Sequence, residues 1–177
     1  KPQTPNPKPQ TPLPTVSIHM EEQSWTLEDF TILEKLGEGK SARVFKAIEK
    51  RSQKTVALKF LEKQSILELS FIHQIRREVE IQHHLHYKHI LKLFGYFITP
   101  NDVVLVIEYA GGRSLYSIVS SKVELQETKI RKILYQLSKS IAYMHLRGVI
   151  HRDIKLENVL LDSNEDVKVI DFGWSVH

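Results

Sequence analysis

Short apolar runs separated by turn or polar residues dominate between residues 30 and 109, which predicts strands rather than helices. The strand-like runs are residues 31–36, 43–48, 55–61, 91–98 and 103–109. A basic turn at 50–54 joins the second and third runs as a hairpin would, and Pro100 marks a turn between the last two. One helix is predicted within this series, at 65–86, where Gly and Pro are absent and apolar residues recur every three positions from Ile66 to Ile75.

A long helix leads the remainder of the chain. Its apolar positions fall on one face and are Ile130, Ile133, Leu134, Leu137, Ile141 and Met144. The helix is expected to end near Gly148, and two short strands follow at 159–161 and 167–170. A strand-rich half followed by a helix-led half predicts two lobes with a cleft between them, which is a common place for a ligand site.

Residues 1–24 differ in composition from the rest and are expected to be a disordered tail. Six of the seven prolines lie between residues 2 and 14, and the pentapeptide Lys-Pro-Gln-Thr-Pro occurs at both 1–5 and 8–12. The Pro-x-x-Pro spacing also fits a peptide ligand, so a solvated tether and an adaptor segment are both open. The folded part is expected to begin near Trp25.

Composition excludes several classes of protein. The chain contains no Cys, which excludes disulfide scaffolds, cysteine nucleophiles and cysteine metal sites. No apolar run approaches the ~20 residues that a membrane-spanning helix needs. The formal net charge of +4 is too small to indicate nucleic-acid binding. The first residue is not Met, and we therefore expect the sequence to be a fragment.

Two segments of the first half suit phosphate chemistry. In the loop 36–44, Gly37 and Gly39 let backbone N–H groups approach phosphates, although such a pair also marks an ordinary tight turn. Lys59 stands in an apolar strand and needs either an anion or access to water. Glu78, in the predicted helix, is a candidate for the counter-charge, although a surface carboxylate is the alternative.

Two segments of the second half suit proton and metal chemistry. Residues 151–158, His-Arg-Asp-Ile-Lys-Leu-Glu-Asn, concentrate charged and polar groups of complementary types between the long helix and a strand. Asp171 follows the strand 167–170, with Gly173 two positions later. A carboxylate at a strand end suits a cation site, and an Asp-x-Gly turn is the alternative.

In this order, the four segments resemble the signature set of the protein kinases. The resemblance covers residues 25–177 and implies a bilobal α+β fold. A five-stranded antiparallel sheet with one helix would occupy 25–108, and an incomplete, mainly helical lobe would occupy 109–177. The finer pattern is similar to the Aurora group of serine/threonine kinases. It is carried by residues 25–30, 76–82, 95–97 and 171–177, of which the last, Asp-Phe-Gly-Trp-Ser-Val-His, is the most specific.

The resemblance implies roles in the transfer of a phosphoryl group from ATP. Asp153 would accept the proton of the substrate hydroxyl, and Lys155 would contact the transferred phosphate. Lys59 would hold the ATP phosphates and pair with Glu78. The residues implied in ATP binding are Leu36, Gly37, Gly39, Lys40, Val44, Ala57, Lys59, Glu108, Tyr109, Ala110, Glu157, Asn158, Leu160 and Asp171.

The cofactors implied by the resemblance are ATP and Mg²⁺, with Asn158 and Asp171 as the metal ligands. The backbone of residues 108–110 would form the hinge that meets adenine, and Ile107 would guard the pocket behind it. A buried column would link the two lobes in the active state; it consists of Gln82, Leu93, His151 and Phe172.

The chain departs from the family pattern at several positions. Ala42 replaces the third glycine of the loop, which would restrict its approach to phosphates. Ile170 replaces the alanine that is usual before Asp171, and the larger side chain would narrow the floor of the ATP pocket. Gly111 and Gly112 are expected to loosen the exit from the hinge.

The sequence ends six residues after Asp171 (177 − 171 = 6), before the activation segment of the family. Burial of the second lobe's apolar surface is therefore expected to be incomplete, with Leu134, Leu137 and Ile141 short of partners. We expect residues 1–177 alone to be poorly stable and catalytically inactive, and a longer parent protein to be active.

Four histidines have a spacing that metal sites also show: His83, His84, His86 and His89. Zinc needs ligands that converge on one point with further groups to orient them. The resemblance places these residues at the end of a helix and in the solvated loop after it, so we predict no metal there.

The leading hypothesis is an Aurora-like kinase that phosphorylates Ser and Thr hydroxyls of protein substrates. The resemblance implies mitotic regulation in cytoplasm and nucleus, at the spindle, centrosome or chromosomes. It also implies an activating protein partner at the first lobe, and a monomer without direct nucleic-acid or membrane contact. Two alternatives stay open: a non-catalytic kinase-like module that binds nucleotide or a partner, and a proline-rich adaptor whose tail is the active part.

Overall fold

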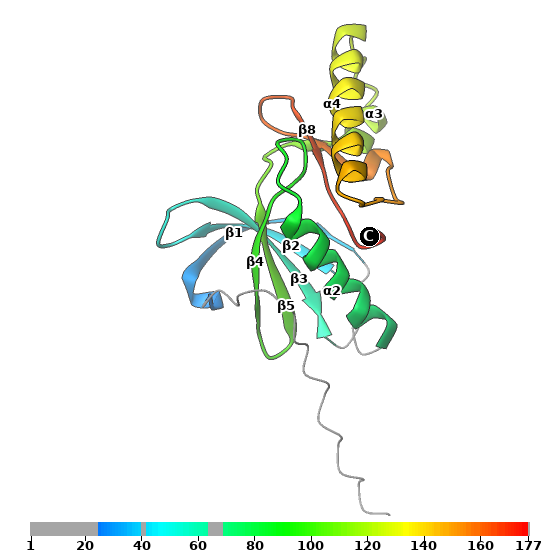
Figure 1. Ribbon diagram of the computed structural model, residues 1–177. Helices are drawn as coiled ribbons and strands as arrows, with labels where there is room; N and C mark the ends of the chain where they lie inside the picture. Colours follow the sequence, from blue (N-terminus) through cyan, green and yellow to red (C-terminus); the bar gives the residue numbers. More distant parts are fainter. Residues whose placement is uncertain (1–24, 40–41, 64–68, 177) are drawn as a thin grey trace, which may run out of the picture.

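The structure, a computed structural model, describes residues 25–39, 42–63 and 69–176. They form two lobes, one with a five-stranded sheet and helix α2, the other with α3, α4 and short strands (Figure 1). The bilobal α+β arrangement predicted from the sequence is therefore confirmed. Residues 1–24, with the adaptor hypothesis that rests on them, lie outside the described part.

The first lobe is built on an antiparallel sheet, as predicted. The short turn η1 (Leu27–Asp29) precedes its strands, which are β1 (Phe30–Glu38), β2 (Ala42–Glu49), β3 (Thr55–Glu62), β4 (Leu93–Ile98) and β5 (Asp102–Glu108). In space, the strands lie in the order β1-β2-β3-β5-β4. Successive side chains of a strand point to opposite faces. Ala57 and Leu105 therefore join the core on the side of α2, whereas Val56 and Val106 join the core around Phe30.

The predicted helix 65–86 is observed as α2 (Leu69–His84), and residues 64–68 lie outside the described part. Ile75 and Val79 are buried in the core between α2 and the sheet. The predicted strand 91–98 begins only at Leu93. The reason is that the Leu91 N–H donates to the Val169 carbonyl of the second lobe (2.9 Å), so this part of the chain ties the lobes together.

The second lobe combines two helices with a small sheet. Its elements are β6 (Arg113–Ser114), α3 (Leu115–Ser120), α4 (Glu127–Leu146), η2 (Leu156–Asn158), β7 (Val159–Leu161) and β8 (Val167–Val169). The long helix and the last two strands were predicted, but β6 and α3 were not, because they are too short to show a period. The Ser114 hydroxyl caps α3 by accepting the Ser117 N–H (3.1 Å).

The two glycines after the hinge hold defined positions, whereas the sequence suggested a loosened hinge exit. Gly111 has a left-handed backbone (φ 68°), a conformation that glycine adopts without strain. Gly112 lies directly on β7: a Cβ atom placed on it would be 1.4 Å from the Leu161 carbonyl oxygen. The two residues that follow pair with β7 as strand β6. The glycines therefore allow a close backbone contact that fixes the hinge exit.

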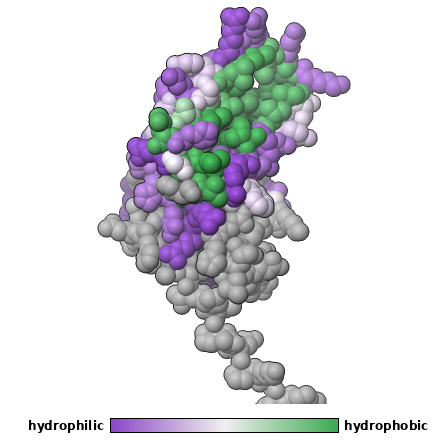
Figure 2. All heavy atoms as spheres, turned by 45° about the vertical axis from the view of Figure 1, so that its right-hand side comes forward, coloured by the Kyte–Doolittle hydropathy of each residue, from purple (hydrophilic) through white to green (hydrophobic). Residues whose placement is uncertain are grey.

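The sequence predicted that helix α4 buries one continuous apolar face. The structure shows a different set of buried positions. The buried positions are Ile133, Gln136, Ser140 and Met144, two of which are polar. Leu137 and Ile141 are half-buried against the same core, so the prediction that they lack partners is wrong. Leu134 is 60% exposed, as predicted. Figure 2 shows an apolar surface over the lobe that holds α4. Within α4 itself, Ile130, Leu134 and Leu146 have exposed side chains.

A buried polar cluster joins α4 to β8 and explains why Gln136 faces the core. Gln136 accepts the Val167 N–H (2.9 Å) and donates to the Asp166 carboxylate (2.6 Å). The His89 ring donates through Nδ1 to the Val167 carbonyl (3.2 Å), and the His89 carbonyl accepts from the Ser140 hydroxyl (3.4 Å). Polar groups of three segments are thereby satisfied within the core.

Stability is expected to fall in mild acid because of His89. Burial lowers the pKa of its imidazole, and the Val167 carbonyl and Asp166, opposed by Lys88 and Lys168, offset only part of this effect. The unfolded chain, with a histidine pKa near ~6.5, then binds more protons, so stability is lost as the pH falls through this region. Replacing His89 with Asn should reduce the slope by up to about 1.4 kcal/mol per pH unit.

The measurement is urea unfolding between about pH 7.5 and pH 5. His83 is half-buried and His151 is buried, and burial lowers the pKa of both imidazoles, so the wild-type slope contains more than one contribution. The comparison with His145→Asn, an exposed histidine of α4, isolates the effect of burial. Equal slopes in the wild type and His89→Asn would refute the prediction.

The remaining histidines of the sequence pattern do not form a metal centre. His83 meets the rings of His84 and His86 edge-on, with centroids 5.6 Å and 6.4 Å apart, while His89 lies in the buried cluster described above. No group of three or more candidate ligands with metal-site geometry occurs among the described residues. Likewise, none of the described helices is long and apolar enough to cross a membrane.

Candidate nucleotide-binding site

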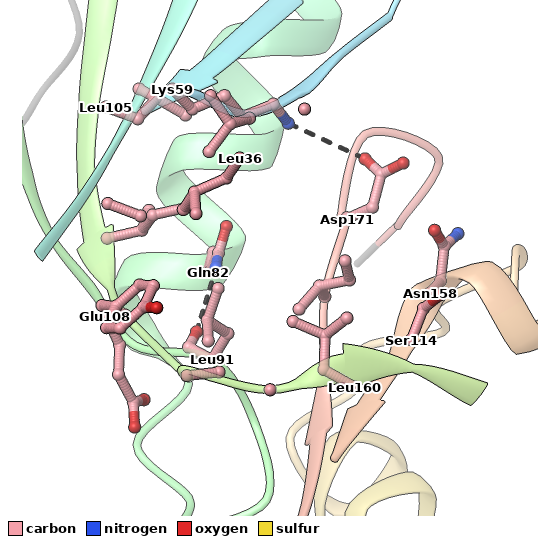
Figure 3. A pocket seen from close by; sticks show the side chains of 18 of the residues that line it. Leu36, Lys59, Gln82, Leu91, Leu105, Glu108, Ser114, Asn158, Leu160 and Asp171 are labelled. Carbon is pink, nitrogen blue, oxygen red and sulfur yellow. Dashed lines mark hydrogen bonds and ion pairs between the residues drawn. The ribbon is translucent and has the colours of Figure 1, made fainter. Parts of the chain in front are cut away.

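A cavity of about 530 Å³ lies between the two lobes. Its roof comes from β1, β2 and β3, its back wall from α2 and β5, and its floor from the second lobe (Figure 3). The lining residues are Leu36, Gly37, Val44, Ala57, Lys59, Glu78, Gln82, Leu91, Leu105, Ile107, Glu108, Tyr109, Ala110, Gly112, Ser114, Ser117, Asn158, Leu160, Ile170 and Asp171. Apolar residues dominate the hinge side, and charged residues gather at the opposite end (Figure 3).

Most residues that the resemblance assigned to ATP line this cavity, but not all do. Gly39 and Glu157 are absent from its lining, and Glu157 is exposed. Lys40 lies outside the described residues. Asp153 and Lys155 do not line the cavity, and the Asn158 amide nitrogen links the Asp153 carboxylate to it (2.9 Å). The structure thus brings most of the residues that the resemblance assigned to ATP into one lining, and it places the two residues that the resemblance assigned to proton and phosphate transfer outside that lining.

Lys59 and Glu78 form a buried ion pair at the charged end. The Lys59 Nζ lies 2.7 Å from the Glu78 carboxylate, and Glu78 is only 6% exposed. A second carboxylate, that of Asp171, lies 3.9 Å from the same Nζ (Figure 3). Burial by itself would lower the pKa of the Lys59 ammonium, but the charges of Glu78 and Asp171 outweigh burial and raise it. Lys59 is therefore a fixed cation inside the cavity.

The pairing follows from the positions of the two residues in their elements. Lys59 sits on β3 opposite Leu105 of β5, with its side chain on the α2 side of the sheet. Glu78 lies on α2 beside Val79, which is packed into the sheet core. A lysine in an apolar strand needed an anion, and α2 carries it.

Side-chain hydrogen bonds hold together the polar loop at residues 151–158. The Asp153 carboxylate accepts from the Lys155 ammonium (2.8 Å) and from the Asn158 amide nitrogen (2.9 Å). The hydrogen bond to Asp153 raises the pKa of Lys155. Arg152 has a left-handed backbone (φ 64°), and its side chain donates to the Trp174 carbonyl (2.6 Å). The loop therefore presents a carboxylate and an ammonium together, on a backbone tied to the last segment of the chain.

Asp171 is placed by a strained backbone and by a buried neighbour. Its φ of 64° is uncommon outside glycine and turns the chain sharply after β8. The next residue, Phe172, is fully buried and packs edge-on against the His151 ring, with centroids 4.9 Å apart. His151 also donates a ring N–H to the Ile170 carbonyl (3.0 Å). These contacts turn the Asp171 carboxylate toward the cavity, where it is 41% exposed (Figure 3).

The hinge side contains residues that the sequence did not reveal. Ser114, Ser117 and Gly112 line the cavity, and only their position after the hinge could have suggested it. Ile170, which is expected from the sequence to narrow the floor of the pocket, is among the residues that line the cavity. Glu108 spans the lobes: its carboxylate pairs with the Lys168 ammonium and accepts the Lys92 N–H.

The sequence matches the protein kinase domain over residues 30–177. The chain belongs to the protein kinase family. Among its relatives, "Aurora kinase" of Patiria pectinifera is 45% identical over 159 residues, covering 89% of this chain and 39% of that protein. "Serine/threonine-protein kinase Aurora-1" of Arabidopsis thaliana is 41% identical over 176 residues, covering 93% and 60%. "Aurora kinase C" of Mus musculus is 45% identical over 153 residues, covering 86% and 55%.

These relatives confirm the Aurora resemblance that the last heptad carried. Their names are those of kinases, which are transferases, so the enzyme class expected from the sequence agrees with its relatives. This kinase chain spans between 39% and 60% of the length of the three relatives. The match covers both the cavity between the lobes and the loop at residues 151–158, which lie within residues 30–177.

Proposed function

We propose that this chain binds Mg·ATP in the cavity between its lobes, and that the protein carrying it transfers the γ-phosphoryl group to Ser and Thr hydroxyls of other proteins. The observation that carries the proposal is the convergence of Lys59, Glu78 and Asp171, three charged groups from three elements, at one end of an apolar cavity. An apolar slot suits a base, and a fixed cation beside a carboxylate suits phosphates with a metal.

Oxygen donors at the charged end fit Mg²⁺, which prefers carboxylates and other hard oxygens. Asp171 offers a carboxylate that is partly exposed to the cavity. Asn158 donates its amide nitrogen to Asp153, which leaves its amide oxygen on the side of Asp171 (Figure 3). Mg²⁺ bound there would neutralise charge on the phosphates during transfer. Lys59, held by Glu78, would supply a further positive charge to the phosphate oxygens.

Asp153 would act as the general base that accepts the proton of the substrate hydroxyl. In the transfer, the hydroxyl oxygen of Ser or Thr forms a bond to the γ-phosphorus, and the bond from that phosphorus to the bridging oxygen of ADP breaks. The hydroxyl proton passes to the Asp153 carboxylate. Lys155, 2.8 Å from this carboxylate, lies where it can also contact the transferred phosphoryl group. The protein mainly positions the reactants and compensates their charge.

The metal assignment can be tested without any transfer assay. In Asp171→Asn, the gain in ATP affinity that Mg²⁺ provides should fall roughly 10- to 100-fold, because a neutral amide replaces a carboxylate ligand. Lys59 keeps Glu78 as its partner, so the fold should persist. Calorimetric titration of ATP with and without Mg²⁺ measures the effect, with the exposed Glu165→Gln as the control. An unchanged dependence on Mg²⁺ would remove Asp171 from the metal site.

We also propose, from the resemblance to the Aurora group, a role in mitosis in the cytoplasm and nucleus, at the spindle, centrosome or chromosomes. Protein substrates and an activating protein at the first lobe belong to the same proposal, as does a monomeric state. Imaging of the tagged full-length protein through cell division tests it. A uniform distribution at every stage would count against this role.

A further inference from the structure

A second cavity, of about 460 Å³, lies on the first lobe and shares no lining residue with the nucleotide cavity. It lies along β4, which is an edge strand of the sheet (Figure 1). Val56 and Val106 line it, whereas their neighbours Ala57 and Leu105 line the nucleotide cavity from the other face of the sheet. We call this second cavity the edge cavity.

The floor and walls of the edge cavity are apolar. Val56, Leu93 and Val106 are buried and form its floor. Trp25 and Phe94 are half-buried and stand as aromatic walls. A pocket of this size with aromatic walls accommodates one large apolar side chain together with its flanking backbone.

The rim of the edge cavity is cationic. Lys54, Lys92 and His86 are exposed there, and the Lys92 ammonium lies 5.4 Å from the centroid of the Phe94 ring. Among the described lining residues, Glu49 is the only one with a carboxylate, and it accepts the backbone N–H groups of Arg51 (2.9 Å) and Ser52 (2.7 Å). Lys54 and Lys92 are therefore not paired with a carboxylate of the described lining, because Glu49 is bound to the backbone of its own turn.

Two further observations concern the polar groups beside the edge cavity. His83 also lines the edge cavity, and its buried Nδ1 has no hydrogen-bond partner among the residues that the structure describes. A neighbouring cavity of about 410 Å³ shares His86, Lys92 and Phe94 and adds Lys88 and Lys168. The carboxylate of that cavity, Glu108, is paired with Lys168. Among the described residues of the two cavities, the lysine side chains therefore outnumber the carboxylates along this side of β4.

We propose that the edge cavity docks an acidic peptide segment of a partner protein. One aromatic or large aliphatic side chain would enter between Trp25 and Phe94, and flanking carboxylates would meet Lys54, Lys92 and the imidazoles. Charge complementarity selects an acidic segment over a basic one. A nucleic acid is disfavoured because the opening offers two lysines over an apolar floor, rather than an extended basic track.

The test uses the fluorescence of Trp25. The chain contains two tryptophans, and replacing the exposed Trp174 with Phe leaves Trp25 as the only reporter. The probe is the peptide acetyl-Glu-Glu-Phe-Glu-Glu-amide, titrated into the full chain at low salt. We expect a saturable change in Trp25 emission, and an affinity that weakens as salt is added because the charges at the opening are exposed.

Charge reversal gives the sharper comparison. Lys54→Glu combined with Lys92→Glu should lower the affinity for the peptide at least about tenfold, because like charges then face each other. The matched control, Lys139→Glu on α4, should leave it unchanged. ATP affinity should stay the same in all three proteins, so the outcome does not depend on the proposed kinase activity.

Several outcomes would overturn the proposal. These are the lack of any saturable signal, equal binding of the double variant, and equal binding of a peptide with Gln in place of Glu. A single-stranded oligonucleotide that displaces the peptide at comparable concentration would indicate nucleic-acid binding instead. Thermal melts of the double variant check that its fold is intact, and a substitution of Phe94 by Leu provides a second, charge-neutral test of the wall.

Discussion

Replacing Asp153 with Asn in the full-length protein is expected to lower the rate of phosphoryl transfer by roughly 10²- to 10⁴-fold, the usual contribution of a general base. The amide keeps the shape of the side chain, but it removes the charge and the proton acceptor. Asp153 does not line the nucleotide cavity, so ATP affinity should change little. Transfer of labelled phosphate to a protein substrate and calorimetric ATP titration measure the two quantities.

The control for this variant is Glu124→Gln, an exposed carboxylate in the loop before α4, which should retain wild-type rates. The alternative of a non-catalytic kinase-like module makes the opposite prediction. If phosphate incorporation is equal in the wild type and in Asp153→Asn while ATP still binds, the signal does not come from this site. The protein would then be a nucleotide-binding module, and the proposed catalytic role of Asp153 would be wrong.

The second large effect concerns stability. Gly112→Ala is expected to lower the free energy of unfolding by about 3 kcal/mol or more, because the added methyl group overlaps backbone atoms. Its Cβ would lie 1.4 Å from the Leu161 oxygen and 2.9 Å from the Asp162 Cα. These atoms cannot move away without breaking the pairing of β6 with β7. The melting temperature should fall by roughly 6–12 °C.

The chain provides a matched control for this effect. At Gly37, on β1, no described atom lies within 4 Å of the position that a Cβ would take. Gly37→Ala should therefore change the free energy of unfolding by less than about 0.5 kcal/mol. Urea unfolding of both variants measures the difference. Equal stability of the two variants would show that the segment after the hinge can move freely, as the sequence alone had suggested.

Strong local patterns were sufficient for much of the fold. The strand predicted at 55–61 is observed as β3 (Thr55–Glu62), and the long helix is observed as α4 (Glu127–Leu146). The first is a short, nearly continuous apolar run and the second has a helical period, so in both cases the signal is in neighbouring positions. Elements of two to six residues, β6 and α3, carry no period and were missed.

Burial was harder to predict than secondary structure. The sequence places Ile133, Leu134 and Met144 on one face of α4, but only Ile133 and Met144 are buried. The true buried face includes Gln136, which is satisfied by Val167 and Asp166 from another element. Hydropathy cannot identify such a position, because a polar side chain is buried in a core only where other residues supply its hydrogen-bond partners.

The site was predicted through its motifs, and the structure determined which of those residues meet. Local sequence identifies Lys59 as a lysine that needs an anion, but 19 positions separate it from Glu78. Their contact depends on α2 packing against the sheet, a long-range event. The family pattern implied that Gly39 and Glu157 bind ATP, but neither residue lines the cavity.

By itself, the sequence determined the longer strands and helices, the proline-rich composition of residues 1–24 and the family signature, because each depends on neighbouring residues in the chain. The tertiary structure alone decided that Gly112 lies on Leu161, and that Trp25, Lys54 and Phe94 surround one cavity. Such arrangements bring together residues that are far apart along the chain. They follow from the packing of whole elements, which depends on many contacts at once and leaves no periodic trace in the sequence.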